Sequence, residues 1–122
     1  MDEVYTIYYN SFGIVFKWKR CTTKDINKIQ LVFRDTGLYL TLNELTLFSK
    51  LIDEALSKPL LCKDCKKNES CKSILLETPI TQVSFVMAHH ELIDLQDLMS
   101  GTLFQFALDD VLQKQIIKRY SC

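Results

Sequence analysis

Two hydrophobic periodicities follow one another twice along this chain, and together they constrain its fold more than any other feature. In four segments between Val4 and Leu40, apolar side chains recur at every second position, which predicts antiparallel strands separated by turns. At Thr41 the spacing changes to that of an amphipathic helix. Between Ile74 and Met87 the alternation returns, and a second helical stripe follows it. This order predicts an α+β fold, with antiparallel β-hairpins and two main helices packed on one face.

The second strand segment has the clearest alternation. Phe12, Ile14, Phe16 and Trp18 occupy every second position, and the intervening residues are Gly13, Val15, Lys17 and Lys19. This alternation indicates one buried face, that of the Phe12 series, and one wetter face. Further along the chain, Asp35-Thr36-Gly37 predicts the turn between the third and fourth strands, because glycine adopts a positive φ angle without strain.

Both helices have recognisable starts in the sequence. Thr41 and Glu44 match a capping box, in which the hydroxyl and the carboxylate satisfy amides of the first helical turn. Pro59 is expected to stop this helix, because proline lacks an N–H group and clashes with the preceding turn. The second helix is predicted to begin near His89 or His90 and to continue through a long apolar stripe.

The chain is expected to form a single domain with two similar halves. Residues 40–45 and 87–92 both end a strand and open a helix with Glu-Leu at the same offset, which suggests a hairpin-plus-helix pseudo-repeat. The alternative is that ordinary strand-to-helix passages look alike. The expected single domain, residues 1–122, comprises a β-rich half with the first helix (1–57), a cysteine loop (58–73), and a hairpin with a long C-terminal helix (74–122).

Charge and hydropathy exclude several classes of partner. The 15 basic residues balance the 15 acidic ones, so no overall field attracts a phosphate backbone, and no nucleic-acid partner is expected. No apolar run approaches the roughly 20 residues that span a bilayer, so no membrane partner is expected. The acidic start of the chain is unlike a signal peptide, which predicts a cytoplasmic protein with reduced thiols.

Three of the five cysteines, Cys62, Cys65 and Cys71, lie close together in a polar segment. A Cys-x-x-Cys turn directs two sulfurs at one centre, and structural zinc needs four tetrahedral ligands. Cys71 supplies a third ligand in this interpretation and Cys21 the fourth, with His89 or His90 as the other candidates. The nearby lysines favour the ionised thiolates.

Other interpretations of these thiols stay open. Cys62 or Cys65 could act as a redox thiol or a nucleophile, and all three could be inert reduced thiols on a polar loop. An iron–sulfur cluster would need Cys21 or Cys122 to be brought close by the fold. Neither a catalytic triad nor a glycine-rich phosphate loop is recognisable, so the chain is not an obvious enzyme.

Two groups of aromatic residues are candidate interaction surfaces. Tyr5, Tyr8 and Tyr9 crowd the first strand, and Phe104 and Phe106 broaden the apolar stripe of the last helix. A homodimer would cover both groups and protect the edges of the sheet. The alternative is that these side chains pack in the core.

The pattern also resembles a family of small, uncharacterised bacterial proteins, a domain of unknown function. The resemblance covers roughly residues 14–112 and lies in short motifs: Ile29-Gln-Leu-Val-Phe33, Leu76-Glu-Thr-Pro79, Val83-Ser-Phe-Val-Met87 and Glu91-Leu92. It implies a compact α+β domain without an assigned activity. Members often carry more than one cysteine before the Ile-Gln-Leu strand, whereas this chain has Cys21 alone there.

The leading functional hypothesis is a small binding or regulatory module with a structural zinc–thiolate loop and a protein partner, which a second copy of the chain could be. A thiol-redox or cysteine-nucleophile protein is one alternative. A metal-free protein-interaction module is the other.

Overall fold

The computed structural model describes residues 4–18, 28–57 and 72–115, and these ranges contain six strands and two helices. In chain order, the elements are β1 (Val4–Tyr9), β2 (Gly13–Trp18), β3 (Lys28–Phe33), β4 (Thr36–Thr41), α1 (Leu42–Ser57), β5 (Lys72–Glu77), β6 (Ser84–Ala88) and α2 (His89–Gln115). β5 therefore begins within the last two residues of the segment 58–73 that the sequence assigned to the cysteine loop.

The strands form two separate antiparallel sheets. β1 to β4 make a four-stranded meander in sequence order, and β5 pairs with β6 in a hairpin of its own. In the meander, Val15 pairs with Leu31, and Leu31 pairs with Leu38, so these three side chains point to the same face. The edge strand β1 carries a bulge between Thr6 and Tyr8.

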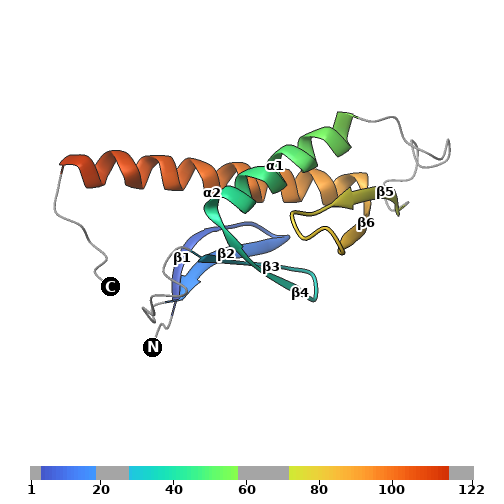
Figure 1. Cartoon of the computed structure of the whole chain (residues 1–122), viewed down its shortest axis with the longest axis horizontal. Coiled ribbons are helices and arrows are strands. Elements are labelled where there is room, and N and C mark those ends of the chain that lie inside the picture. Colours follow the sequence, from blue (N-terminus) through green and yellow to red (C-terminus); the bar gives the residue numbers. More distant parts are fainter. Residues whose placement is uncertain (1–3, 19–27, 58–71, 116–122) are drawn as a thin grey trace.

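Both helices lie over the same face of the four-stranded sheet (Figure 1). α2 is the longest element and crosses the molecule from the β5–β6 hairpin to a point beyond β1, while α1 packs against α2, β4 and β5. This arrangement confirms the predicted α+β class with helices on one face. Neither helix in the described ranges combines the length and apolarity needed to cross a membrane.

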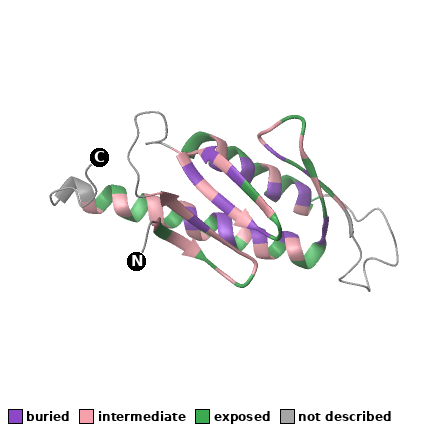
Figure 2. Ribbon diagram, turned by 90° about the horizontal axis from the view of Figure 1, so that it is seen from below, coloured by how far each residue is buried: buried purple, intermediate pink, exposed green. Residues whose placement is uncertain are grey.

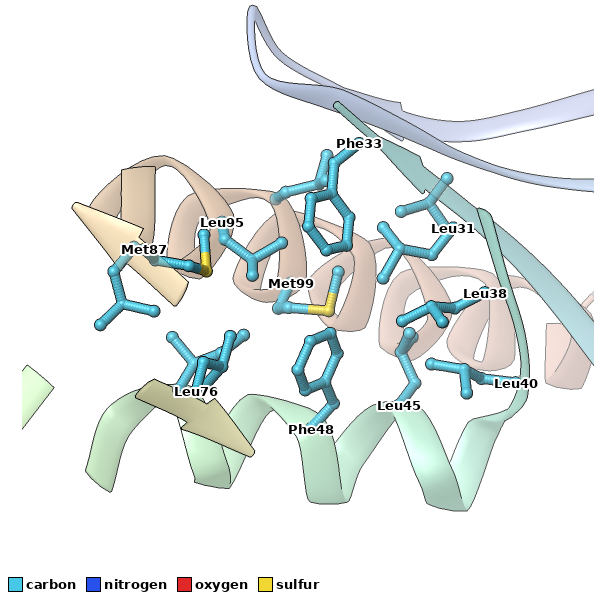
Figure 3. Packing of buried hydrophobic residues seen from close by; sticks show 14 of the residues in the cluster. Leu31, Phe33, Leu38, Leu40, Leu45, Phe48, Leu76, Met87, Leu95 and Met99 are labelled. Atoms are coloured by element: carbon cyan, nitrogen blue, oxygen red, sulfur yellow. The ribbon is translucent and has the colours of Figure 1, made fainter. Parts of the chain in front are cut away.

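A single hydrophobic core joins both sheets to both helices. Phe48 of α1 and Met99 of α2 point toward one another in its centre (Figure 3), and neither side chain is exposed. Burial of each such side chain contributes roughly 1.5–3 kcal/mol of transfer free energy. The core contains Val15, Ile29, Leu31, Phe33, Leu38, Leu40, Leu45, Phe48, Ile52, Ala55, Leu76, Met87, Leu92, Leu95, Leu98 and Met99.

Both helices begin with the same glutamate contact. At α1, the backbone N–H of Thr41 donates to Glu44 Oε1 at 2.8 Å, and the N–H of Glu44 donates to Thr41 Oγ1 at 3.1 Å, which confirms the predicted capping box. At α2, the N–H of Ala88 donates to Glu91 Oε1 at 2.9 Å. A hairpin followed directly by a helix thus occurs twice, and a duplication as its origin stays a prediction.

The turn between β3 and β4 differs from the sequence prediction. It consists of Arg34 and Asp35, and Arg34 rather than Gly37 has a positive φ angle, of 52°. The side chain of Arg34 offsets this backbone strain, because its guanidinium bonds to Glu91 Oε1 at 2.6 Å and donates to the Val86 carbonyl oxygen at 3.1 Å. These contacts tie the four-stranded sheet to the start of α2 and to the β5–β6 hairpin.

Candidate functional site

The predicted zinc ligands lie outside the described residues. Cys21 belongs to the connection between β2 and β3, and Cys62, Cys65 and Cys71 belong to the connection between α1 and β5. The ends of the elements that flank these two connections lie at opposite ends of the molecule (Figures 1 and 2). The zinc–thiolate site, and the inclusion of Cys21 in it, stay predictions. Cys122 also lies outside the described ranges.

The two histidines are the first residues of α2, and both are exposed. They stand at the same end of the molecule as the start of β5, because Lys72 of β5 pairs with Ala88, the residue before His89. Within the described ranges, no group of three or more histidine, cysteine or acidic side chains is arranged to hold a metal ion.

The most distinctive surface is the face of the four-stranded sheet that points away from the helices, which we call the outer sheet face. Figure 2 looks onto it from below, and no helix or strand of the described ranges crosses it. The strand register places three rows of side chains on this face: Val4, Trp18, Lys28 and Thr41 in the first, Thr6, Phe16, Gln30 and Tyr39 in the middle, and Tyr9, Ile14, Val32 and Gly37 in the last.

The outer sheet face corrects the sequence interpretation of β2. Val15 is the fully buried residue of this strand, whereas Ile14, Phe16 and Trp18 are half-buried on the opposite face. The predicted strand is present, but its Val15 side faces the core, and the side with Phe16 and Trp18 faces away from it. Of the apolar series only Phe12, which precedes β2, packs against the core, with its ring 5.5 Å from that of Phe33.

The rings of the outer sheet face are held in place by contacts within the face. Phe16 meets Trp18 edge-on with the ring centres 5.2 Å apart, and Trp18 Nε1 donates to Gln30 Oε1 at 3.3 Å. Gln30 Nε2 in turn donates to the carbonyl oxygen of Leu38 at 3.3 Å. At the far side, the Lys28 ammonium lies 5.4 Å from the centre of the Tyr39 ring. The aromatic surface is therefore pre-organised rather than loose.

The outer sheet face carries little charge. Among the described strand residues of this face, Lys28 is the only charged one, and the others are apolar, aromatic, amide, hydroxyl or glycine residues. An aromatic and apolar surface with few charges is typical of the central part of protein interfaces, from which charged residues are depleted. A surface of this kind can bind another apolar surface by excluding water.

The tyrosine and phenylalanine residues predicted to form interfaces differ in their exposure to solvent. Tyr9 and Phe104 are 69% and 64% exposed, and Tyr5 is 38% exposed. Tyr8 and Phe106, by contrast, pack against the core. A further stripe runs along the end of α2, where exposed apolar residues recur at helical spacing: Phe104, Leu108 and Val111.

Tyr8 and its neighbours join β1 to α2. The Tyr8 hydroxyl donates to Asp97 Oδ2 at 3.2 Å, and Asn10 Nδ2 donates to the same oxygen at 2.9 Å and to the Asp94 carbonyl oxygen at 2.9 Å. The Tyr8 ring lies directly on Gly101, where a Cβ atom would overlap with it. α2 continues through Gly101 as one helix, so this glycine permits close packing of the tyrosine.

Tyr8 is expected to make the stability of the protein fall at alkaline pH. Partial burial, and then the negative charge of Asp97 that accepts its hydrogen bond, raise the pKa of Tyr8 above its ordinary value of 10.0. The folded state therefore holds this proton more tightly than the unfolded state, so its contribution is complete below pH 10.0 and is lost as the pH rises through the folded-state pKa. Urea unfolding of the wild type and of Tyr8→Phe between neutral and alkaline pH measures this contribution. The same slope in both proteins would contradict it.

The described part of the chain also has an open cavity beside the start of α1. Its volume is about 390 Å³. The residues that line it are Lys17, Ile29, Thr41, Leu42, Asn43 and Phe106. The amides of Thr41 and Glu44 at this helix start are already bonded within the capping box, so they offer no free donors to a ligand in the cavity.

Comparison with known proteins finds no matching family model, curated protein or solved structure. The resemblance to small, uncharacterised bacterial proteins therefore stays an expectation drawn from short sequence motifs.

Proposed function

We propose that this protein is a small protein-binding module and that its binding surface is the outer sheet face. The observation that carries the proposal is the set of half-buried apolar and aromatic side chains on the side of the sheet away from both helices, with Phe16, Trp18 and Val32 among them. Tryptophan and tyrosine are enriched among the residues that contribute most to protein binding. Rings already fixed by neighbouring side chains lose little conformational entropy on binding.

The charge of the surface favours a protein over a nucleic acid as partner. Binding to a phosphate backbone rests on several lysine or arginine contacts, whereas Lys28 is the single cation among the described strand residues of the outer sheet face. The overall charge of the chain is 15 − 15 = 0, which supplies no long-range attraction either. An apolar protein surface is the better match.

The proposal requires the outer sheet face to be open in the isolated chain, and Trp18 reports on this directly because it is the only tryptophan. We expect acrylamide to quench Trp18 fluorescence in the folded protein at nanomolar concentration. A Trp18→Phe, Tyr9→Trp double variant moves the single tryptophan to an exposed position on the same face, since Tyr9 is 69% exposed. The Stern–Volmer constant of this variant is the reference for an uncovered tryptophan. A Stern–Volmer constant for Trp18 more than about tenfold below that of the double variant would show a covered face and contradict the proposal.

A structural zinc site in the connection between α1 and β5 is a second candidate feature of the same module. The spacing of Cys62, Cys65 and Cys71 supports it. His89 is a candidate fourth ligand, because the residue before it pairs with Lys72, which follows Cys71 directly. Cys21 and His90 are the other candidates, on the sequence pattern alone.

Native mass spectrometry tests the zinc site in protein purified without chelator or affinity metal. We expect about one zinc ion per chain, and we expect it to be absent in Cys62→Ala. Acidification is expected to release the zinc, because it protonates the cysteine thiolates that bind the metal. Separate Cys21→Ala, His89→Ala and His90→Ala variants identify the fourth ligand. A metal-free mass with reduced thiols would contradict the site. The thiol-redox alternative would then require alkylation of Cys62 or Cys65 with a depressed thiol pKa.

A further inference from the structure

We propose that the open cavity beside the start of α1 binds a small organic carboxylate with an apolar body, and that Lys17 supplies the positive charge for it. This ligand site goes beyond the proposed protein-binding function and does not depend on it. Three features of the molecule support the site: the side of β2 on which Lys17 stands, the lack of an acidic partner for its ammonium group, and the chemistry of the cavity walls.

Lys17 is a charged residue on the side of β2 that faces the helices. It stands two residues after Val15, whose side chain is fully buried, so the two side chains point to the same side of the strand. Ile29 of the neighbouring strand, which lines the cavity together with Lys17, is only 2% exposed. Lys17 itself is half-buried. Lysine is among the residues most rarely buried without a partner for its charge.

The ammonium group of Lys17 has no acidic partner in the part of the chain that the structure describes. The ion pair found there joins Arg34 to Glu91, and the residues that line the cavity include no acid. Glu44, the acid at the start of α1, accepts the backbone N–H of Thr41 instead. The wall of the cavity therefore carries an uncompensated positive charge, which attracts an anion more strongly where water is partly excluded.

The other walls suit the uncharged body of such a ligand. Ile29, Leu42 and Phe106 contribute apolar surface from β3, α1 and α2 in turn. Small-molecule pockets commonly combine apolar walls with a few polar groups that fix the orientation of the ligand. The cavity volume of about 390 Å³ falls within the range of roughly 300–1,000 Å³ for such pockets.

The polar groups of the cavity favour a carboxylate over a phosphate. A single ammonium group matches a single negative charge, whereas a phosphate monoester carries close to two at neutral pH. Asn43 adds a carboxamide to the wall, and its NH₂ group can donate to a carboxylate oxygen beside Lys17. The site therefore matches a monocarboxylate that carries an aromatic ring or a short aliphatic chain.

Titration with phenylacetate tests the site, because this probe joins one carboxylate to one phenyl ring. In NMR amide spectra, we expect saturable shifts of the Asn43 side-chain amide and of the Leu42 backbone amide. The dissociation constant is expected to be about millimolar, since the probe has few atoms and the cavity is open. Phenylacetamide, which has the same shape without the charge, is expected to bind at least about tenfold more weakly.

Two substitutions of Lys17 separate its charge from its packing. Lys17→Met removes the charge but keeps the apolar stem, and it is expected to weaken phenylacetate binding at least about tenfold. Lys17→Arg keeps the charge and is expected to keep the binding. Lys50→Met is the matched control, because Lys50 is an exposed lysine of α1 outside the cavity, and it is expected to leave the affinity unchanged. Circular dichroism checks that the variants fold, and Asn43→Ala, at an exposed position, replaces Lys17→Met if that variant does not.

Three results would overturn the carboxylate site. Equal affinities for phenylacetate and phenylacetamide would show an apolar surface that does not recognise an anion. Equal losses of affinity in Lys17→Met and Lys50→Met would show non-specific attraction to lysines. A lack of saturable shifts at Leu42 and Asn43 throughout the millimolar range would show that the cavity does not bind this class of ligand. The quenching of Trp18 tests the outer sheet face separately, so failure of one site does not decide the other.

Discussion

Replacement of Phe48 by alanine is expected to lower the free energy of unfolding by about 3–5 kcal/mol, the range observed for truncation of buried aromatic side chains. Phe48 is fully buried between the helices and points toward Met99 (Figure 3). The cost has two parts, the lost transfer free energy of the ring and the cavity that it leaves. Urea unfolding followed by circular dichroism measures the change.

Leu47 provides the matched control for this substitution. It is the preceding residue of α1, but its side chain is 45% exposed on the other side of the helix. Leu47→Ala is therefore expected to change the free energy of unfolding by less than about 1 kcal/mol. Equal losses in the two variants would show that the core does not lie between α1 and α2 as described.

Gly13→Ala is expected to cost roughly 1–3 kcal/mol, because it adds an atom where the structure has no room. The new Cβ would overlap with the carbonyl oxygen of Val32 and stand 2.9 Å from Phe33 Cβ and 3.1 Å from Leu98 Cδ2. Two of these three atoms belong to side chains packed in the core, and the third is backbone, so little can move aside. Thermal or urea unfolding measures the loss.

Gly37→Ala is the comparison for that loss, since both glycines lie in strands of the same sheet. A Cβ at Gly37 would stand 3.2 Å from Gln30 Nε2, which is the end of a flexible side chain. The change in unfolding free energy is expected to stay within about 1 kcal/mol, because a small contact is offset by reduced freedom of the unfolded chain. A loss at Gly37 as large as that at Gly13 would contradict the proposed crowding.

The local features of the fold were predictable from the sequence. The change of period at Thr41, together with Glu44 three residues later, predicted both the start of α1 and its capping hydrogen bonds. The antiparallel hairpins and the start of α2 at His89 followed in the same way. Contacts between residues near in sequence decide these features, so a short window contains the information.

The candidate sites were predictable to different degrees. The spacing of Cys62, Cys65 and Cys71 suggested a metal site, which stays untested because those residues lie outside the described ranges. The outer sheet face was not predicted, because the alternation in β2 was interpreted with its faces exchanged. The available signal was the register with β3, in which Val15 pairs with Leu31 of a strictly alternating strand and so shares its buried face.

The sequence by itself determined the order and type of the elements and their caps, because hydrophobic periodicity and helix-start chemistry act within a few residues. Only the tertiary structure decided which face of the sheet the helices cover. An alternating strand offers two faces, and the choice depends on packing across the chain, such as the close approach of Gly13 to Leu98 and of Gly101 to Tyr8. That choice left Phe16 and Trp18 on the outer sheet face, where the proposed binding surface lies.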